Sequence, residues 1–503
     1  MVSPLILAAC AAIPVVYVTF PAMRISLLVL SVVLLIGCLL WSALKKHKGI
    51  FHVIPPKYVT AGFAVFLGLA AGFCCVAGIG QYAPGLPLDK ITSIKGKLLD
   101  DPRSFASSAG NGEERGMAAV KLSETGGSSG RVRCSARGRV LVYFPDGTMP
   151  RLREFGRGAE LYIEGNFLPD TAGAAGRAGA PVEPPRFRAQ SVHIITKAPA
   201  PERLRTSIRG EILARLKPKA WGGLASALLL GVRENLDDTL ALSFRNAGLS
   251  HILALSGMHL AFISAMLAFV LKKPLGKKRS IIAGFAFIVL YVFLVGPQPS
   301  LVRAVIMYAL GSFLVLTGAA RQTLALLSAA FLVQILWDPS SAYSVSFILS
   351  YLALAGILVL SGPALTLLRG KIPSSLAAGL SASAGAFLFT APVVAAFFGI
   401  LRPAGLIAGL IAAPLSGIFM ALSFLWLLLA KLPLVGTAAG FVLDRLLAAL
   451  QFVMQYVISF FARWGGVSVS FPLACVVSPL LICCLLWFAN RHTRYRNELI
   501  RFA

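Results

Sequence analysis

The sequence predicts a polytopic α-helical membrane protein of about 12 spans, with a small OB-like β-barrel inserted on the extracytoplasmic side. Of its 503 residues, 57% are hydrophobic and only 13% are charged, whereas soluble domains usually carry about 25% charged residues. Apolar runs of roughly 20 residues recur through most of the chain, and each is long enough to cross a bilayer. One region of about 110 residues instead alternates short β-branched stretches with turns.

The formal net charge of +27 has two interpretations. In a membrane protein, basic cytoplasmic loops alone supply such an excess. The sharper alternative is that part of the charge contacts a polyanion. Seven of the eight cysteines lie in apolar runs, and no CxxC or Cys/His metal spacing occurs. We therefore expect no disulfide framework, no metal site and no cofactor.

The N-terminal region, residues 1–82, is predicted to be a membrane anchor of three helices, over 5–20, 25–44 and 58–79. The basic run Lys45–Lys48 marks the cytoplasmic side. The N-terminus is therefore expected inside, and the third helix delivers the chain to the outer face. The lack of a basic segment before the first helix favours a retained anchor over a signal peptide.

Residues 83–200 are predicted to form the OB-like barrel outside the membrane. Two connections rich in Gly, Ala, Ser and Pro, Ser104–Gly116 and Pro169–Pro185, are expected to be mobile. Five strands with alternating β-branched residues are expected over Ile91–Leu99, Met117–Leu122, Val132–Phe144, Ala159–Phe167 and Arg186–Ile195.

The third of these strands carries a cluster of arginines followed by an aromatic residue. Basic residues combined with aromatics on a barrel face bind single-stranded nucleic acid without sequence preference. The alternative is an ordinary solvated strand face. The candidate DNA-binding residues of the barrel are Arg131, Arg133, Arg137, Arg139 and Tyr143.

Residues 201–250 are predicted to form amphipathic surface helices. In the first, over 202–219, apolar residues recur every four positions between arginines and lysines, which is typical of a helix lying on a membrane surface. A short apolar helix follows. A third helix is capped by Asp237 or Asp238, and Gly248 occupies the position that ends it.

Residues 251–490 are predicted to form the transmembrane core, and residues 491–503 a basic cytoplasmic tail. Basic residues in 268–273 and 277–279 mark a cytoplasmic loop after the first core span, and Pro414 is placed to break a later one. The further spans are expected over Ile281–Val295, Leu301–Thr317, Leu324–Trp337, Tyr343–Leu360, Leu376–Phe398, Leu406–Leu429, Leu434–Phe461 and Leu473–Phe488.

Polar side chains inside predicted spans are costly in hydrocarbon and mark sites of function or helix packing. One set shares a face of the span 434–461, where it either lines an aqueous path or joins helices. Arg303 either contacts the substrate or snorkels to the outer interface. A second polar face lies in the span 343–360. The pathway candidates from these sets are Arg303, Ser350, Tyr351, Asp444, Gln451 and Gln455.

The stretch 247–273 begins as a polar, glycine-containing segment and becomes a membrane span. In a continuous helix His251 and His259 would lie about 12 Å apart along the axis, too far for one metal ion. Ser256 and Gly257 between them favour a break. A half-helix that begins around His251 is expected to point backbone N–H groups into the protein interior, as a phosphate contact.

The segment Leu224–Ile263 resembles the signature of the ComEC family of competence proteins. Weaker agreement at Arg303–Met307, Trp337–Ile357 and Ala391–Leu415 extends the resemblance over about residues 202–429. The residues that match the signature are Gly231, Arg233, Phe244, Arg245, Ala247, Gly248, His251, Leu253, Ala254, Ser256, Gly257 and His259.

The resemblance implies an inner-membrane channel that carries single-stranded DNA into the cytoplasm during natural transformation. Its implied partners are single-stranded DNA, the lipid bilayer, a separate DNA receptor and a cytoplasmic translocation ATPase, while a separate nuclease and a homo-oligomer stay open. The implied location is the bacterial cytoplasmic membrane. The rival function is a transporter or flippase of another anionic polymer or lipid. The resemblance adds to the DNA-pathway candidates Arg233, Arg245, His251, Ser256, Gly257 and His259.

No catalytic motif occurs in the sequence. Many members of that family end in a metallo-β-lactamase-like nuclease domain with an H-x-H-x-D-H motif, which this chain lacks. A P-loop is also missing. We therefore expect no enzyme activity in this chain.

Overall fold

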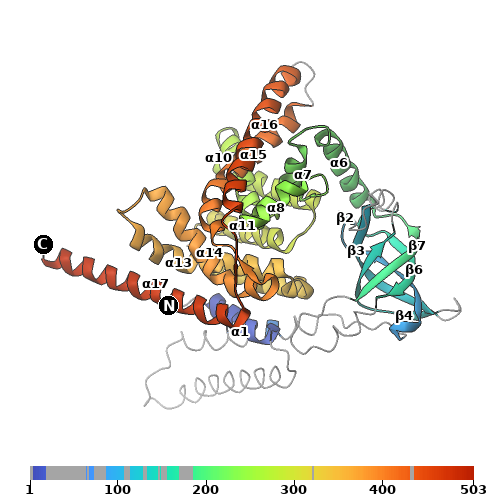
Figure 1. Ribbon diagram of the computed structural model, residues 1–503, viewed down its shortest axis with the longest axis horizontal. Helices are drawn as coiled ribbons and strands as arrows, with labels where there is room; N and C mark the ends of the chain where they lie inside the picture. The colour runs from blue at the N-terminus through green and yellow to red at the C-terminus, as the bar shows by residue number, and fades with distance from the viewer. Residues whose placement is uncertain are drawn as a thin grey trace, which may run out of the picture. The chain divides into compact units, whose positions relative to one another are not determined.

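The computed structural model describes residues 4–17, 64, 67–68, 70–72, 87–106, 114–127, 133–145, 148, 156–168, 185–319, 322–430 and 435–502 (Figure 1). The chain divides into two compact units, one built mainly on residues 72–215 and the other mainly on residues 216–503. Of the predicted N-terminal anchor, the first helix is α1 (Pro4–Tyr17). The predicted span 25–44 and most of 58–79 lie outside the described residues.

The first unit contains a closed five-stranded barrel, which confirms the predicted OB-like fold. Its strands pair in the order β1–β3–β5–β7–β6 and close through β6–β1. The β5–β7 pairing is parallel and the others are antiparallel. The strand bounds are β1 (Ile91–Leu98), β3 (Glu114–Gly127), β5 (Arg139–Phe144), β6 (Glu160–Phe167) and β7 (Arg186–Thr196).

Two details of the predicted strands are wrong. The expected single strand Val132–Phe144 is two strands, β4 (Arg133–Ser135) and β5, because the chain turns at Gly138 with φ 124°. The expected mobile connection Ser104–Gly116 contains paired backbone at both ends, where β2 (Arg103–Ala106) forms a ladder with the start of β3. Composition alone did not indicate this pairing.

The barrel interior is filled by alternate residues of its strands, as the period of two predicted. Ile94, Val120, Val140 and Ile163 are each fully buried there. Barrel closure needs a tight approach at Gly96, where a Cβ would lie 2.3 Å from the carbonyl oxygen of Lys121. The register of β1 against β3 shifts next to this glycine. A small residue is therefore required at the point where the sheet curves most strongly.

Helix α6 (Ala200–Leu216) is joined to the barrel by buried charges. Arg205 is only 2% exposed. Its Nη1 donates to Asp101 Oδ1 at 3.0 Å and to Glu202 at 3.1 Å, while Arg209 donates to the other oxygen of Asp101 at 2.7 Å. Leu204 is 60% exposed on the same helix. That this helix lies on a membrane surface stays a prediction.

The Asp101 carboxylate is held in its charged form by its surroundings. Burial alone would raise its pKa, but the hydrogen bonds from Arg205 and the charges of Arg209, Arg205 and Arg157 outweigh that effect. The pKa of Asp101 is therefore lowered. Loss of this charge would leave two buried or half-buried arginines without their shared partner.

The second unit is helical. Within the described residues, eight segments are long and apolar enough to cross a membrane: 257–276, 278–295, 299–317, 345–368, 374–398, 404–429, 439–462 and 471–490. The apolar helix α12 (Thr323–Trp337) is shorter, at 15 residues. The chain is thus a multi-pass membrane protein, as predicted, whereas the total of about 12 spans stays a prediction.

The helices of this unit follow the predicted order. Their bounds are α7 (Gly222–Leu230), α8 (Asp238–Asn246), α9 (Ser250–Leu253), α10 (Gly257–Val295), α11 (Pro299–Thr317), α12, the 3₁₀ turn η2 (Pro339–Tyr343), α13 (Val345–Leu368), α14 (Ser374–Phe398), α15 (Ala404–Leu429), α16 (Val435–Ala462) and α17 (Phe471–Phe502). A short ladder of β8 (Ile400–Leu401) with β9 (Val467–Ser468) joins two connections.

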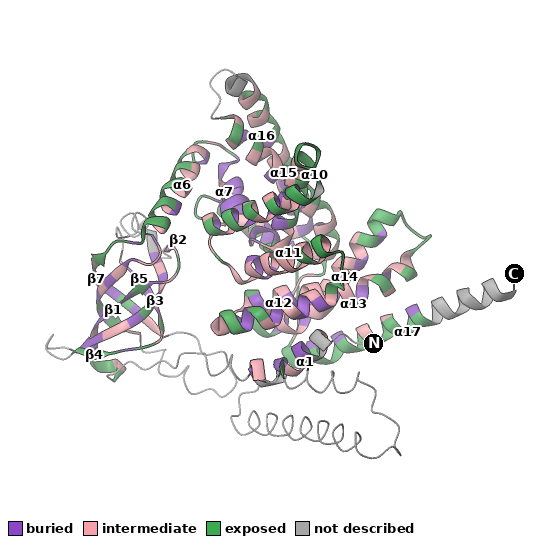
Figure 2. Cartoon of the chain, turned by 180° about the vertical axis from the view of Figure 1, so that it is seen from behind, coloured by how far each residue is buried: buried purple, intermediate pink, exposed green. Residues whose placement is uncertain are grey.

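Three helices differ from expectation. The predicted basic loop over 268–279 is helical on both sides of a sharp kink at Gly276, with φ 72° and ψ 172°. Helix α15 runs without interruption through Pro414. Helix α7 was expected at a surface, yet nearly all of its residues are buried (Figure 2). Its residues are mostly apolar on every side of the helix, as expected of a helix surrounded by protein.

Close backbone contact joins α13 to α14. A Cβ at Gly356 would lie 2.2 Å from the carbonyl oxygen of Gly385, and a Cβ at Gly385 would lie 2.6 Å from the carbonyl oxygen of Gly356. Small residues at helix interfaces let membrane helices approach this closely. The outer faces of the long helices carry exposed apolar side chains such as Phe269 and Phe452, as expected of surfaces in contact with lipid.

We expect Asp101→Asn to lower the free energy of local opening of the barrel and α6 by about 1–3 kcal/mol. Amide hydrogen exchange in these elements of the purified full-length protein should therefore become faster. Because the folded-state pKa is lowered, this stabilisation is complete above the unfolded-state pKa of about 3.9. It disappears as the pH falls through the lower folded-state pKa. Glu211→Gln removes the exposed pair with Arg215 and should change exchange by less than about 0.5 kcal/mol. Equal effects of the two substitutions would contradict the buried-charge interpretation.

We expect Gly356→Ala to destabilise the membrane unit by about 1–3 kcal/mol, because its methyl group forces two helix backbones apart. Gly311→Ala in α11 is the matched control, since a Cβ there would meet only the side chain of Leu326, at an ordinary contact distance of 3.9 Å. That control should be neutral or stabilising by up to about 1 kcal/mol. Thermal unfolding of both variants in detergent tests the difference, and identical midpoints would refute the close-packing argument.

Candidate functional site

The start of α10 is the centre of the candidate site, and the chain reaches it through two helix ends. Asp237 caps α8 by accepting from the backbone N–H of Thr239 at 3.0 Å. Gly248, with φ 76°, ends that helix. One turn of helix, α9, follows, and the backbone is then extended at Ser256. The half-helix therefore begins at Gly257 and not around His251, so that expectation is wrong.

His259 is fully buried in the first turn of α10. Its Nδ1 accepts from the backbone N–H of Ser256 at 3.2 Å and lies 2.9 Å from the hydroxyl of the same residue. A backbone N–H can only donate, so Nδ1 is unprotonated and the proton of this neutral imidazole is on Nε2. That Nε2 has no acceptor among the described residues. His251 lies before the break, on α9.

Arg303 lies in the second turn of α11 and is 8% exposed. It is therefore buried and does not snorkel. Its Nη1 donates to the backbone carbonyl of Ser350, and its guanidinium lies 5.7 Å from the ring centre of Tyr351. A Cβ on Gly257 would lie 3.0 Å from its Nη2. The structure thus brings together four sequence candidates, Gly257, Arg303, Ser350 and Tyr351.

A chain of hydrogen bonds fixes these helices to one another. The Tyr351 hydroxyl donates to Gln334 Oε1 at 2.9 Å, and Gln334 Nε2 donates to the carbonyl of Pro299 at 3.0 Å. The Ser300 hydroxyl donates to the carbonyl of Leu255 at 2.8 Å. Sequence reasoning missed Gln334 and Ser300. Gln334 was detectable by the rule applied to the other spans, since it is an amide within an apolar run.

The polar face of α16 lies elsewhere, because α16 packs on α15 and α8 whereas α11 packs on α10, α12 and α13. Asp444 accepts from Trp221 Nε1 at 2.8 Å and forms an ion pair with Lys219 at 3.3 Å. Gln451 Oε1 is buried without a partner among the described residues, and Gln455 is half-buried. Asp444 therefore joins helices, and it is not assembled with Arg303.

The other basic candidates of the core are exposed. Arg233 lies between α7 and α8, and Arg245 lies in the last turn of α8. A neighbouring arginine that the sequence analysis missed, Arg402, donates to the carbonyl of Asn246 at 2.8 Å. It fixes the end of α8 to the start of α15.

The barrel carries a basic strip on the outer face of β3, β5 and β7. The strand register places Arg139 beside Lys121, Leu141 beside Arg186, and Tyr143 beside Arg188. Arg133 and Arg137 are exposed nearby in sequence, and Arg131 lies outside the described residues. We define the basic strip as Lys121, Arg139, Tyr143, Arg186 and Arg188.

Three residues of the basic strip, Lys121, Arg186 and Arg188, were missed by sequence reasoning. Each occupies an outward position of a predicted strand, so its exposure was predictable. Which strands adjoin β5 was not, because the parallel partner β7 is distant in sequence. An arginine beside a half-exposed tyrosine provides a phosphate contact and a stacking surface together.

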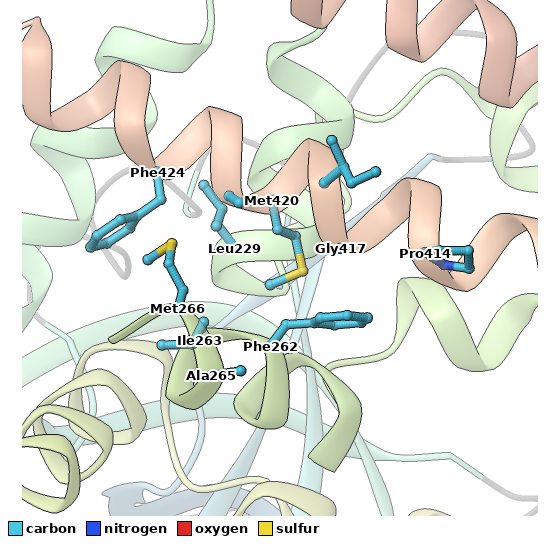
Figure 3. Close-up of a pocket in the computed structure, with 11 residues that line it drawn as sticks. Leu229, Phe262, Ile263, Ala265, Met266, Pro414, Gly417, Met420 and Phe424 are labelled. Atoms are coloured by element: carbon cyan, nitrogen blue, oxygen red, sulfur yellow. The ribbon is translucent and has the colours of Figure 1, made fainter. Parts of the chain in front are cut away.

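An apolar cavity of about 350 Å³ lies between α7, α10 and α15 (Figure 3). Phe262, Ile263 and Met266 of α10 face Met420 and Phe424 of α15 across it. Its walls offer no charged group, so it accommodates hydrocarbon and not a charged polymer. Among the described residues, no cluster of three or more His, Cys, Asp or Glu side chains is placed to hold a metal ion.

Comparison with known proteins places the start of α10 and Arg303 inside a region that matches a known family. A model of the Competence protein family matches residues 228–492, just over half of the chain. ComE operon protein 3 of Bacillus subtilis (strain 168) is 28% identical over 162 residues, which cover 31% of this chain and 20% of that protein. No solved structure matches the chain.

Two further relatives have less informative names. An uncharacterized protein of Aquifex aeolicus (strain VF5) is 26% identical over 205 residues, 40% of this chain and 47% of that protein. The uncharacterized protein YcaI of Escherichia coli (strain K12) is 25% identical over 164 residues, 30% of this chain and 22% of that protein. In all three cases the match spans less than half of the relative's length.

Asp444 substitutions test the helix-joining role. Asp444→Asn keeps an oxygen that accepts from Trp221 but loses the charge opposite Lys219, so we expect a loss of less than about 1 kcal/mol. Asp444→Ala leaves the buried indole N–H unpaired and should cost about 1–3 kcal/mol. Thermal unfolding in detergent measures both. A variant with normal stability but without transport would instead place Asp444 on the substrate path.

Proposed function

Because the chain belongs to the Competence protein family, we propose that it translocates single-stranded DNA into the cytoplasm during natural transformation. The observation that carries the proposal is the family match over residues 228–492, which includes the start of α10 and the buried Arg303. Membership connects the chain with competence, and the basic groups of both units suit a polyanionic substrate.

The basic strip is the proposed first contact for DNA. Sequence-tolerant binding of a single strand needs cations for the phosphates and an aromatic face for the bases. Arg139, Arg186 and Arg188 provide the cations, and Tyr143 on β5 is paired with Arg188 on β7. Arg133 and Arg137, which are exposed, extend the positive charge.

The proposed path through the core uses the start of α10. Arg303 and the first turn of α10 provide positive charge and backbone dipoles near the ends of two candidate membrane spans. The exposed Arg233 and Arg245 are proposed to guide the strand. The unpaired oxygen of Gln451 and the half-buried Gln455 are the α16 groups that remain candidates for an aqueous path.

We propose a location in the bacterial cytoplasmic membrane, with the barrel outside and both termini inside. A separate receptor would deliver DNA, and a cytoplasmic translocation ATPase would drive its movement. No chemical step is assigned to this chain. A separate nuclease and a homo-oligomer remain open.

A specific observation favours one second candidate function, the transport or flipping of a lipid. The cavity between α7, α10 and α15 is apolar throughout, and both α10 and α15 are long enough to span a membrane (Figure 3). A lipid acyl chain fits such a wall chemically, whereas a DNA backbone does not.

We expect deletion of the gene in a transformable host to abolish DNA uptake, and re-expression of the full chain to restore it.

We expect Arg139→Ala with Arg188→Ala to weaken oligothymidine binding by the purified protein at least about tenfold at low salt, because two phosphate contacts are lost. Tyr143→Ala should cost about 1–3 kcal/mol of binding through lost base stacking.

The control is Lys90→Ala with Arg203→Ala, which removes the same charge from exposed positions outside the basic strip. Fluorescence anisotropy over a salt series measures binding. If both double substitutions weaken oligothymidine binding equally, the overall charge of the protein explains binding and the basic strip has no special role. Unchanged uptake after deletion would eliminate the DNA function and favour the lipid alternative.

A further inference from the structure

Arg303 is a buried cation without a carboxylate partner among the described residues. No ion pair of the described chain includes it. A guanidinium has five N–H donors, and the hydrogen bond of this one goes to a neutral carbonyl, that of Ser350. Its Nε is buried and has no acceptor in the described chain. The side chain therefore retains unused donors at a buried position.

Its neighbours do not balance the cost of burying this charge. Removing an ion from water costs several kcal/mol even after the surroundings relax. The ring of Tyr351, at 5.7 Å, returns about 0.5–2 kcal/mol through a cation–π interaction. A single bond to a neutral carbonyl adds about 1.5–3 kcal/mol at most. An anion in contact with the unused donors would supply the missing stabilisation.

The backbone around Arg303 also favours an anion. A Cβ on Gly257, the first residue of α10, would lie 3.0 Å from Nη2. The guanidinium thus lies at a helix N-terminus, which carries about half a positive charge and attracts anions. Arg303 itself is in the second turn of α11. The positive side chain of Arg303 therefore lies next to the positive end of a helix, and no ion pair of the described residues provides a negative group there.

We infer that Arg303 and the first turn of α10 form a binding site for a single phosphate group. The guanidinium fork matches two oxygens of a phosphate, and the absence of a side chain at Gly257 lets the guanidinium approach the helix end closely. The phosphate belongs either to a DNA backbone or to a phospholipid headgroup. The DNA assignment rests on the proposed function, while the phosphate site itself does not.

His259 is not part of this site. It lies two residues after Gly257, which turns its side chain about 200° around the helix. Its Nδ1 is engaged by Ser256. Residues at the same helical phase as His259, Ile263 and Met266, line the apolar cavity instead (Figure 3).

The test measures the reactivity of Arg303 in the intact full-length protein, delipidated in dodecyl maltoside, a detergent without phosphate. Phenylglyoxal modifies accessible arginines, and peptide mass spectrometry reads each position separately. Arg445 is the internal control, because it also lies over an aromatic ring, that of Phe441 at 5.2 Å, but is exposed on α16. The added ligands are inorganic phosphate, oligothymidine, its uncharged methylphosphonate analogue, and phosphatidylglycerol.

We expect oligothymidine to slow modification of Arg303 by at least about fivefold without affecting Arg445, and the methylphosphonate analogue to have no effect, because only charged phosphates bind the guanidinium. Protection by phosphatidylglycerol but not by oligothymidine would assign the phosphate to lipid and overturn the DNA source. Failure of every phosphate to protect, or no reaction of Arg303 in detergent alone, would overturn the site.

Substitutions provide a second readout in cells. Arg303→Gln should reduce DNA uptake at least about tenfold, Arg303→Lys should retain part of it, and Arg445→Gln should retain all of it. Gly257→Ala leaves the arginine in place but crowds its Nη2, so an intermediate loss is expected. If the wild-type protein supports DNA uptake and Arg303→Gln supports it equally well, the phosphate site is refuted but the proposed DNA function is not. If the wild-type protein supports no DNA uptake but phosphatidylglycerol protects Arg303 from modification, the DNA function is refuted and the phosphate site is retained.

Discussion

Inside a bilayer, a buried donor or acceptor has no water to bond to, so it must find a partner in the chain or in a ligand. This constraint explains most polar positions of the membrane unit. Tyr351, Gln334 and Pro299 satisfy one another across α11, α12 and α13. Trp221 and Asp444 do the same between α7 and α16. Buried polar groups without a partner among the described residues stand out against this background, and of those Arg303 carries a permanent charge.

The barrel meets a related constraint in a different way. Closing five strands removes the sheet edges, and the helix that leaves the barrel is fixed by Arg205 and Arg209 on the single carboxylate of Asp101. The inner face is lined mainly by apolar side chains. Cations are therefore confined to the outer face, where the register of β3, β5 and β7 gathers them into the basic strip.

Both units present positive charge, but they do so in different surroundings. On the barrel the charges are exposed or half-exposed, so salt screens them and they suit a first, reversible contact. Arg303 is buried, so salt screens its charge much less and one phosphate would bind it strongly. The apolar cavity beside α10 offers no such charge, which is why hydrocarbon is its natural occupant.

The sequence by itself determined the membrane class, the barrel and the family, because spans, strand alternation and the motif around His251 to His259 are local patterns. It also singled out Arg303 and Tyr351 as polar groups in apolar runs. The break at Ser256 and Gly257 was also indicated by the sequence. Only the tertiary structure decided that Asp444 accepts from Trp221 and that Arg188 lies beside Tyr143. These facts depend on pairings between segments distant in sequence, such as β5 with β7, and the period of a single segment carries no information about its neighbours.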